Sequence, residues 1–156
     1  MNCKVIPAQQ VSFIKTCKEV LEGDAAMVVF AEGVREYDPL KMASDFETQQ
    51  GLRPSKERAC FYSIISFHPE EKPSDKTLLE IGQKYLETIG IVDTQYVLVK
   101  RLDTDGLTLH LIANMVNNEG KVIKDNYIWI RGEQAARKLT KHYFVVTQEN
   151  TPVSLP

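Results

Sequence analysis

The sequence contains no stretch that approaches the roughly 18 to 20 consecutive apolar residues of a membrane-spanning helix. Its first residues also lack the charged leader and apolar core of a secretory signal. Several catalytic signatures are missing as well, because no P-loop, GxGxxG, nucleophile elbow or HExxH pattern occurs. We therefore expect a cytoplasmic protein with no membrane segment and with none of these common nucleotide or hydrolase motifs.

Cysteine is scarce and charge of one sign is not in excess. Cys3, Cys17 and Cys60 form no CxxC pair and have no histidine nearby in sequence, which argues against a zinc knuckle. We expect free, mostly buried thiols. The net charge of −2 provides no global basic field, so any nucleic-acid site must be a local patch.

What is present suits one folded domain. The 156 residues are 43% hydrophobic, which is enough for one continuous core. We predict a single domain over residues 1–156, with a polar, proline-containing tail from about residue 146.

The hydrophobic periodicity predicts alternating helices and strands. Helical spacing marks residues 11–21, a segment from Pro39 past Phe46, residues 74–90 and residues 133–143. Short β-branched or aromatic runs mark strands at 25–31, 59–67, 94–102 and 107–116, the last two joined by a turn in a β-meander that continues to 121–123. This mixture predicts an α+β fold, with a central antiparallel β-sheet and helices packed against it.

Strand 107–116 carries the one histidine that suggests chemistry. Side chains alternate along a strand, so the aliphatic face of Leu107, Leu109, Leu111 and Ala113 is the predicted core face. His110 then points the other way with Thr108, Ile112 and Asn114. It is either a metal ligand near Asp103 and Asp105, or simply a hydrogen-bonded surface histidine.

Three stretches in succession resemble a known family. They read AEGVREYDPLKMASDFETQQGLRP, then YSIISFHPEEKPSDKTLLEIGQKYLETIGIVDTQYVLVKRLDTDG, then HLIANMVNNEGKVIKD. Together they are similar to the relaxase domains of mobilisable plasmids and transposons, and the resemblance spans residues 13–143. It implies an antiparallel sheet with a histidine cluster for a divalent metal, Mg²⁺ or Mn²⁺. It also implies a tyrosine that attacks a phosphodiester of single-stranded DNA at a transfer origin.

The departures from that family pattern fall on its site positions. The family's His-x-His-x-His, followed by Asn, here reads Gly106, Thr108, His110 and Asn114. A further family histidine aligns with Tyr62, and Glu19 or Lys18 stands where the nucleophilic tyrosine is expected. The family's polar Asn-Asp stretch is replaced by 127–129. Because the scaffold positions match, we predict a relaxase-like domain with lost or reduced nicking activity.

A DNA-binding module without catalysis is the first hypothesis. It needs a local basic groove, with Tyr62, Tyr127 or Trp129 as stacking surfaces. The candidate basic residues are Arg53, Lys56, Arg58, Lys100, Arg101, Lys121, Lys124 and Arg131. Each of them can also be an ordinary solvated charge, and the aromatic residues can be core or contact residues.

Two alternatives remain. One is an active relaxase in which Tyr62, or Tyr37, serves as a relocated nucleophile beside His110, with His110 as the remaining metal ligand for Mg²⁺ or Mn²⁺. A phenol with an ordinary pKa near ~10 is a slow nucleophile without help. The other is a protein-interaction module for accessory mobilisation proteins, for which Glu70, Glu71, Asp75 and Glu80 would provide an exposed acidic surface.

Overall fold

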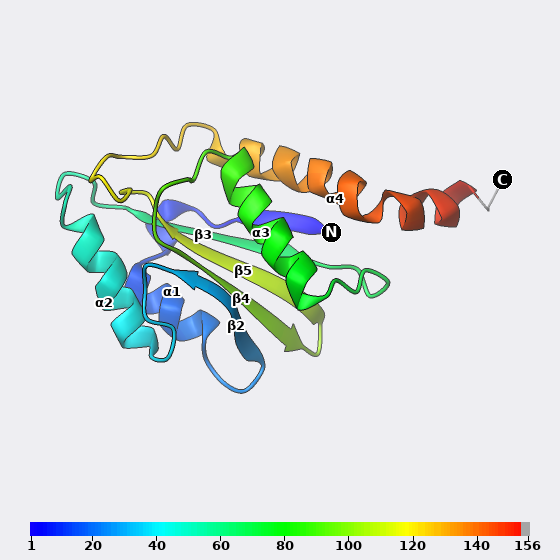
Figure 1. Ribbon diagram of the computed structural model, residues 1–156, viewed down its shortest axis with the longest axis horizontal. Helices are drawn as coiled ribbons and strands as arrows, with labels where there is room; N and C mark the ends of the chain where they lie inside the picture. Colours follow the sequence, from blue (N-terminus) through cyan, green and yellow to red (C-terminus); the bar gives the residue numbers. More distant parts are fainter. Residues whose placement is uncertain (154–156) are drawn as a thin grey trace.

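The computed structural model describes the backbone of residues 1–153 and the side chains of residues 1–144. Five strands form one fully antiparallel sheet in the order β1-β3-β5-β4-β2. Their bounds are β1 Asn2–Val5, β2 Ala26–Glu32, β3 Cys60–Ser66, β4 Tyr96–Asp103 and β5 Gly106–Asn114. Helices cover both faces of the sheet (Figure 1). The predicted α+β class is confirmed.

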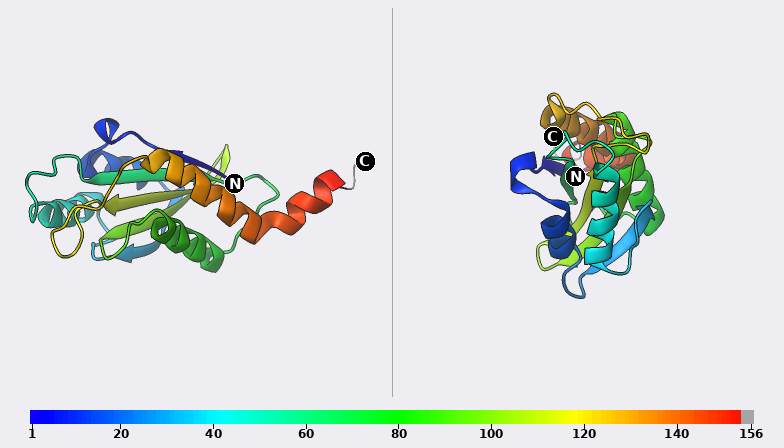
Figure 2. Two further views of the ribbon diagram at one scale, coloured as in Figure 1. Left: turned by 90° about the horizontal axis from the view of Figure 1, so that it is seen from above. Right: turned by 90° about the vertical axis from the view of Figure 1, so that its left-hand side faces the viewer.

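The helices divide into two pairs, one on each face. The first pair is α1 (Phe13–Val20) with α2 (Pro39–Gln50), and the second is α3 (Asp75–Thr88) with α4 (Ile128–Val153). A short 3₁₀ turn, η1 (Ala8–Gln10), links β1 to α1. Figure 2 shows α4 crossing the sheet beside β1 and running on past the end of the strands.

Local sequence explains where three of the helices begin. The Ser12 hydroxyl accepts a hydrogen bond from the Lys15 N–H, and the Ser74 hydroxyl accepts one from Thr77 N–H. Asp38 caps α2 in the same way, with Pro39 in the first turn, where its missing N–H costs nothing. The predicted cap at Ser74 is therefore confirmed.

Strand β5 runs through the middle of the sheet and separates two apolar clusters. Leu109, Leu111 and Ala113 point to the α3/α4 face and are fully buried there, as the alternation predicted. On the other face, Ile112 packs with the helices α1 and α2. The second face is thus partly covered, because its helices bring their own apolar stripes, including stacked Phe13 and Phe46 rings 4.6 Å apart.

The structure differs from the predicted elements at four places. Strand β1 was not predicted, since four residues with little alternation leave almost no pattern. The expected strand at 121–123 is reduced to one bridge between Val116 and Val122. Helix α4 begins before residue 133, because Ile128 already packs on the core. The expected tail from about residue 146 is helical as far as Val153, and residues 154–156 lie outside the described part.

Two further features bear on the edges and the thiols. The pairing of β2 with β4 shifts register between Val28 and Phe30, which is a β-bulge on an edge strand. The three cysteines are free and buried, as predicted. Within the described residues, no helix combines the length and apolar character needed to cross a membrane.

Candidate functional site

A chain of three side chains crosses the sheet face that α1 and α2 partly cover. The Tyr62 hydroxyl lies 2.7 Å from His110 Nδ1, and His110 Nε2 lies 2.9 Å from the Thr108 hydroxyl. The rings of Tyr62 and His110 are stacked with centroids 5.9 Å apart. Strand register produces this arrangement, because Tyr62 on β3 lies diagonally across from His110 on the neighbouring β5.

Burial sets the protonation of this chain. His110 is 8% exposed, and desolvation lowers its pKa to about 4, with the positive charge of Arg101 adding to the effect. Desolvation raises the pKa of Tyr62 to about 12, and the Glu19 carboxylate adds to this shift. At neutral pH the imidazole and the phenol are therefore both uncharged. His110 is hydrogen-bonded but buried, which corrects the surface placement in one of the two initial interpretations.

A neutral imidazole carries one proton, and its two nitrogens then have different roles. A phenol is the better donor, so the consistent assignment has Tyr62 donating to Nδ1 while Nε2–H donates to Thr108. In this arrangement the only lone pair of the ring is occupied. The residues around His110 do not fit a divalent metal, and no group of three histidine, cysteine or acidic side chains occurs in the described part of the chain.

Helix α1 places a carboxylate beside this chain. Glu19 and Tyr62 line the same open pocket of about 660 Å³, together with Lys15 and Thr16. Lys18 does not line it. Of the two residues that sequence alignment offers at the family's nucleophile position, the structure brings Glu19 to the site.

Asn114, at the asparagine position of the family pattern, makes hydrogen bonds that hold the fold together. Its side chain is fully buried, donates to the Phe46 carbonyl and to Gln95 Oε1, and accepts from the Val116 N–H. Gln95 in turn donates to the carbonyls of Gly33 and Asp45. This amide network ties β5 and β4 to α2. Sequence analysis did not find the role of Gln95, because no local pattern marks it.

Six of the eight predicted basic residues come together at one end of the sheet. They lie on the loop between α2 and β3, on the loop that follows β5, and on the first turn of α4, namely Arg53, Lys56, Arg58, Lys121, Lys124 and Arg131. The two loops touch, since Arg53 donates to the Gly120 carbonyl and Lys56 pairs with Asp125 at 3.1 Å.

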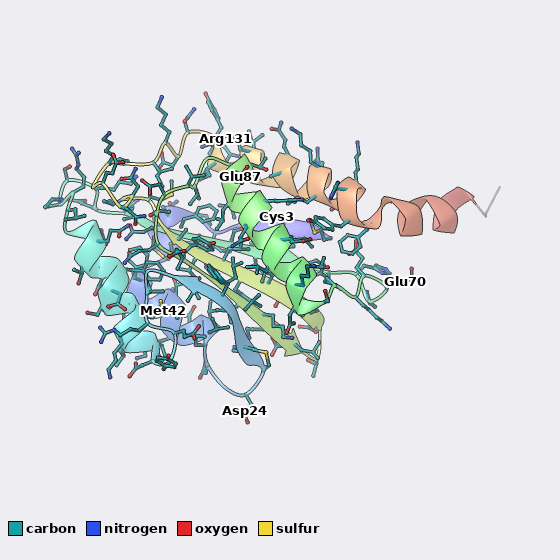
Figure 3. The ribbon with its side chains drawn as sticks, in the orientation of Figure 1. Cys3, Asp24, Met42, Glu70, Glu87 and Arg131 are labelled. Carbon is teal, nitrogen blue, oxygen red and sulfur yellow. The ribbon has the colours of Figure 1, made fainter. Side chains whose placement is uncertain are left out.

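Not all six are available to a ligand. Arg131 donates to the carbonyls of Ile89, Lys124 and Asn126, so it lies beside the end of α3 (Figure 3). Lys121 pairs with Glu119. Arg58 and Lys124 are exposed and make no salt bridge with any described residue. Arg53 is exposed as well and donates only through Nε, to the Gly120 carbonyl, so these three are the basic side chains of this end that the described residues engage least.

Lys100 and Arg101 lie elsewhere and do not extend that cluster. They are neighbours on β4, so their side chains point to opposite faces. Lys100 pairs with Asp75 at the start of α3. Arg101 donates to the carbonyls of Val20 and Glu22 at the end of α1 and pairs with Asp103. These two residues therefore lie apart from the other six, because strand geometry and contacts with helix ends engage them separately.

The aromatic candidates also divide. Tyr127 and Trp129 are 64% and 55% exposed, and their rings lie 6.1 Å apart at the start of α4. They are surface residues and not core residues. Tyr37 is 89% exposed in the turn before α2, and the ring nitrogens of His110 are bonded to Tyr62 and Thr108 instead.

The expected acidic surface is incomplete. Glu71 is buried, where it accepts from the amino group of Met1 and from the His68 N–H. Asp75 is paired with Lys100, and Glu80 accepts from the Tyr143 hydroxyl. Glu70 is exposed. Burial of Glu71 in an ion pair, which sequence does not reveal, removes it from the predicted protein-binding surface.

Comparisons with known proteins identify the family to which this domain belongs. The model of the MobA/VirD2-like relaxase nuclease domain matches residues 16–144, and the chain belongs to this family. One relative is Protein TraI of Escherichia coli, which is 29% identical over 89 residues. That match covers 57% of this chain, but the chain spans only 12% of the length of TraI.

Proposed function

We propose that this relaxase-family domain binds single-stranded DNA at a transfer origin and has lost metal-dependent nicking. The observation that carries the proposal is the closed Tyr62–His110–Thr108 hydrogen-bond chain. In the family pattern these positions hold imidazoles that converge on a metal. Here a neutral phenol and a neutral hydroxyl stand in two of those places, and neither is a good ligand for Mg²⁺ or Mn²⁺.

The nucleophile position supports the same proposal. Glu19 lines the pocket beside Tyr62, where the family carries a tyrosine. A carboxylate there adds negative charge next to any phosphate that approaches the sheet face, and this repels the scissile group. The domain therefore has neither the full set of metal ligands nor a tyrosine nucleophile at the positions where the family pattern places them.

DNA binding is supported by the loop end of the sheet. Arg58 and Lys124 are exposed there, and the aromatic rings of Tyr127 and Trp129 lie nearby on the first turn of α4. A combination of basic side chains and exposed aromatic rings is the usual recognition surface for single strands, because phosphates attract the charges and bases stack on the rings.

One observation favours a second candidate, an active relaxase with a relocated nucleophile. The Tyr62 hydroxyl lies 2.7 Å from a neutral His110 nitrogen, which is the geometry of a nucleophile and its general base. The phenol pKa near 12 and the imidazole pKa near 4 argue against it, because proton transfer between them is strongly uphill.

The deciding experiment incubates the protein with single-stranded oligonucleotides from the transfer origin of its own element, with Mn²⁺. Intact-mass analysis then looks for a covalent protein–DNA adduct, with Tyr62→Phe as the matched control. We expect no adduct, together with salt-sensitive binding of the oligonucleotide. An adduct that is present in the wild type and absent in Tyr62→Phe would establish the active relaxase instead.

A further inference from the structure

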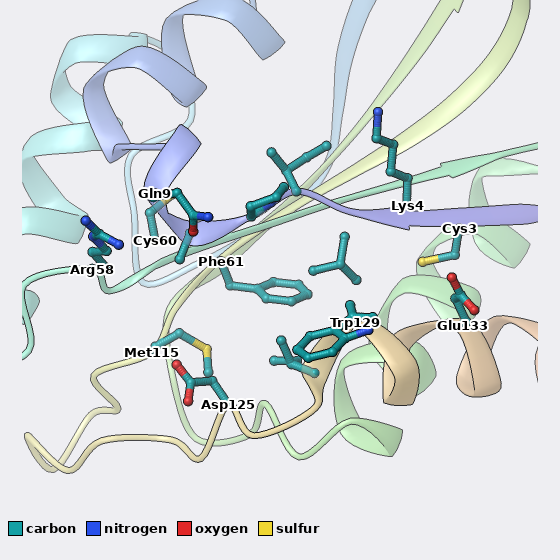
Figure 4. Close-up of a pocket in the computed structure, with 15 residues that line it drawn as sticks. Cys3, Lys4, Gln9, Arg58, Cys60, Phe61, Met115, Asp125, Trp129 and Glu133 are labelled. Carbon is teal, nitrogen blue, oxygen red and sulfur yellow. The ribbon is translucent and has the colours of Figure 1, made fainter.

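A pocket of about 550 Å³ lies between β1 and the start of α4, away from the Tyr62–His110–Thr108 chain (Figure 4). Apolar side chains form most of its wall, including Phe61, Met115 and Ile128. The ring of Trp129 also lines it. Its size is within the usual range for sites that hold small organic groups.

The charges that line this pocket cancel. Lys4 and Arg58 contribute two positive charges, while Asp125 and Glu133 contribute two negative ones. A phosphate therefore gains no net attraction by entering, whereas a neutral planar group can bury its faces against the apolar wall. Positive charge accumulates outside the pocket, where Lys124 is exposed on the adjoining loop.

The backbone at the mouth of the pocket holds aromatic rings in the open. Tyr127 has φ 55°, a left-handed conformation that is strained for a bulky residue. It ends the loop after β5 and starts α4 so that Tyr127 and Trp129 are both exposed, with ring planes inclined by 56°. Exposed rings beside an apolar pocket provide a stacking surface that the folded core does not use.

We propose that this pocket takes one unpaired base of a single strand of DNA, stacked on Trp129, with Arg58 and Lys124 receiving the flanking phosphates. The proposal rests on the proposed function, DNA binding, and adds the place and chemistry of one base. Lys56 engages only Oδ2 of Asp125, and carboxylates only accept hydrogen bonds, so Asp125 Oδ1 and Glu133 favour a base with an exocyclic amino group. Adenine, cytosine and guanine carry such a group with two donor hydrogens, whereas thymine offers only its single ring N3–H.

Trp129 is the only tryptophan of the chain, so its fluorescence reports directly on the pocket. The experiment titrates the intact protein with oligo(dC) and, separately, with oligo(dT) of the same length at low salt. Stacking of a base should quench Trp129, and oligo(dC) should bind about fivefold more tightly than oligo(dT). These two pyrimidine strands match in length and charge but differ at N3, at the C4 substituent and in the thymine methyl, so the carboxylate variants decide whether Asp125 and Glu133 cause any preference.

Four variants refine the test. Trp129→Ala should weaken oligo(dC) binding about tenfold, Trp129→Phe should retain most of it, and Tyr37→Ala should leave it unchanged as an exposed aromatic elsewhere. The double variant Asp125→Asn/Glu133→Gln should abolish the preference for oligo(dC). Binding of both strands without a change in Trp129 fluorescence would overturn the base pocket and leave DNA binding intact. If neither strand binds at low salt, the proposed function fails first and the base pocket fails with it.

Discussion

On the sheet face beside α1, Tyr62, His110 and Thr108 bond to one another, and their polar atoms are satisfied internally. At the loop end, Arg58 and Lys124 remain unpaired among the described residues, and Trp129 stands exposed next to an apolar pocket. The first region occupies positions that the family resemblance assigns to catalysis, and the second includes residues 127–129, which stand in place of that pattern's polar stretch. The exposed basic and aromatic groups therefore lie away from the Tyr62–His110–Thr108 chain, as expected if the domain binds DNA without nicking it.

The largest effect should come from placing histidines at two positions of the Tyr62–His110–Thr108 chain. In the double variant Tyr62→His/Thr108→His, two new rings extend from positions whose side chains already reach His110 within 2.9 Å. Three converging imidazoles are a strong set for Zn²⁺ or Co²⁺, and we expect binding at least ~100-fold tighter than in the wild type.

Isothermal titration with Zn²⁺ and the visible spectrum of bound Co²⁺ would measure this gain. The matched control is Tyr62→Phe/Thr108→Val, which opens the same hydrogen-bond chain without adding ligands. Equal metal affinity in both double variants would mean that the side chains at positions 62, 108 and 110 do not converge. The description of the Tyr62–His110–Thr108 region would then be wrong.

The buried amide network should show the next largest effect. Asn114→Leu keeps the size of the side chain but leaves the Phe46 carbonyl, Gln95 Oε1 and the Val116 N–H without this partner. Unpaired buried polar groups each cost about 1 to 3 kcal/mol, so the free energy of unfolding should fall by about 3 kcal/mol or more.

Urea denaturation followed by circular dichroism measures that change. Asn118→Ala is the control, because Asn118 makes one exposed hydrogen bond to Asp93. We expect a change below ~0.5 kcal/mol for this surface position. A similar loss in both variants would show that Asn114 is not a specific support of the site face.

The pH dependence of the free energy of unfolding should test whether His110 is buried in its neutral form. The pKa of His110 is about 4 in the folded state against an ordinary 6.5, so the unfolded chain binds more protons between these values. The stabilisation is complete above pH 6.5 and is lost as the pH falls toward 4. A shift of this size corresponds to roughly 3 kcal/mol.

Urea denaturation at pH 7 and at pH 4.5 tests this effect with the variant His110→Gln. The variant should lose most of the difference in unfolding free energy between the two pH values. His68→Gln replaces an exposed histidine and serves as the control. An unchanged pH response in His110→Gln would contradict a buried neutral imidazole.

The smallest effect concerns the loop end. Arg58→Ala/Lys124→Ala should weaken single-stranded DNA binding several-fold and reduce the salt slope by about 1.4, since each contact contributes about 0.7 for single strands. Lys100→Ala should change little, because Lys100 pairs with Asp75 at the start of α3. Fluorescence anisotropy of a labelled oligonucleotide at several salt concentrations would give both quantities.

The sequence predicted the fold class, the four helices and four of the five strands, because their apolar residues repeat with the period of each element. It did not predict β1, whose hydrogen bonds to β3 carry no local signature. The alternation in strand 107–116 placed His110 opposite Leu109 correctly. It could not predict that helices would bury His110, because burial depends on elements distant in the chain.

The basic residues illustrate the same limit. Charge and composition identified Arg58 and Lys124 together with Arg101 and Arg131. The guanidinium groups of the last two, however, donate hydrogen bonds to backbone carbonyls at helix ends and in loops. Whether a charged side chain is free depends on the carbonyls and carboxylates that the fold brings to it. No spacing in the sequence encodes those partners.

The two edges of the sheet have a consequence for behaviour in concentrated solution. An exposed edge strand can recruit the strand of another molecule, which is a common route to aggregation. Here β1 offers only four residues, and β2 is interrupted by the bulge between Val28 and Phe30. Neither edge presents a long, regular row of free amide groups, so we expect the domain to resist edge-to-edge polymerisation even when it is crowded.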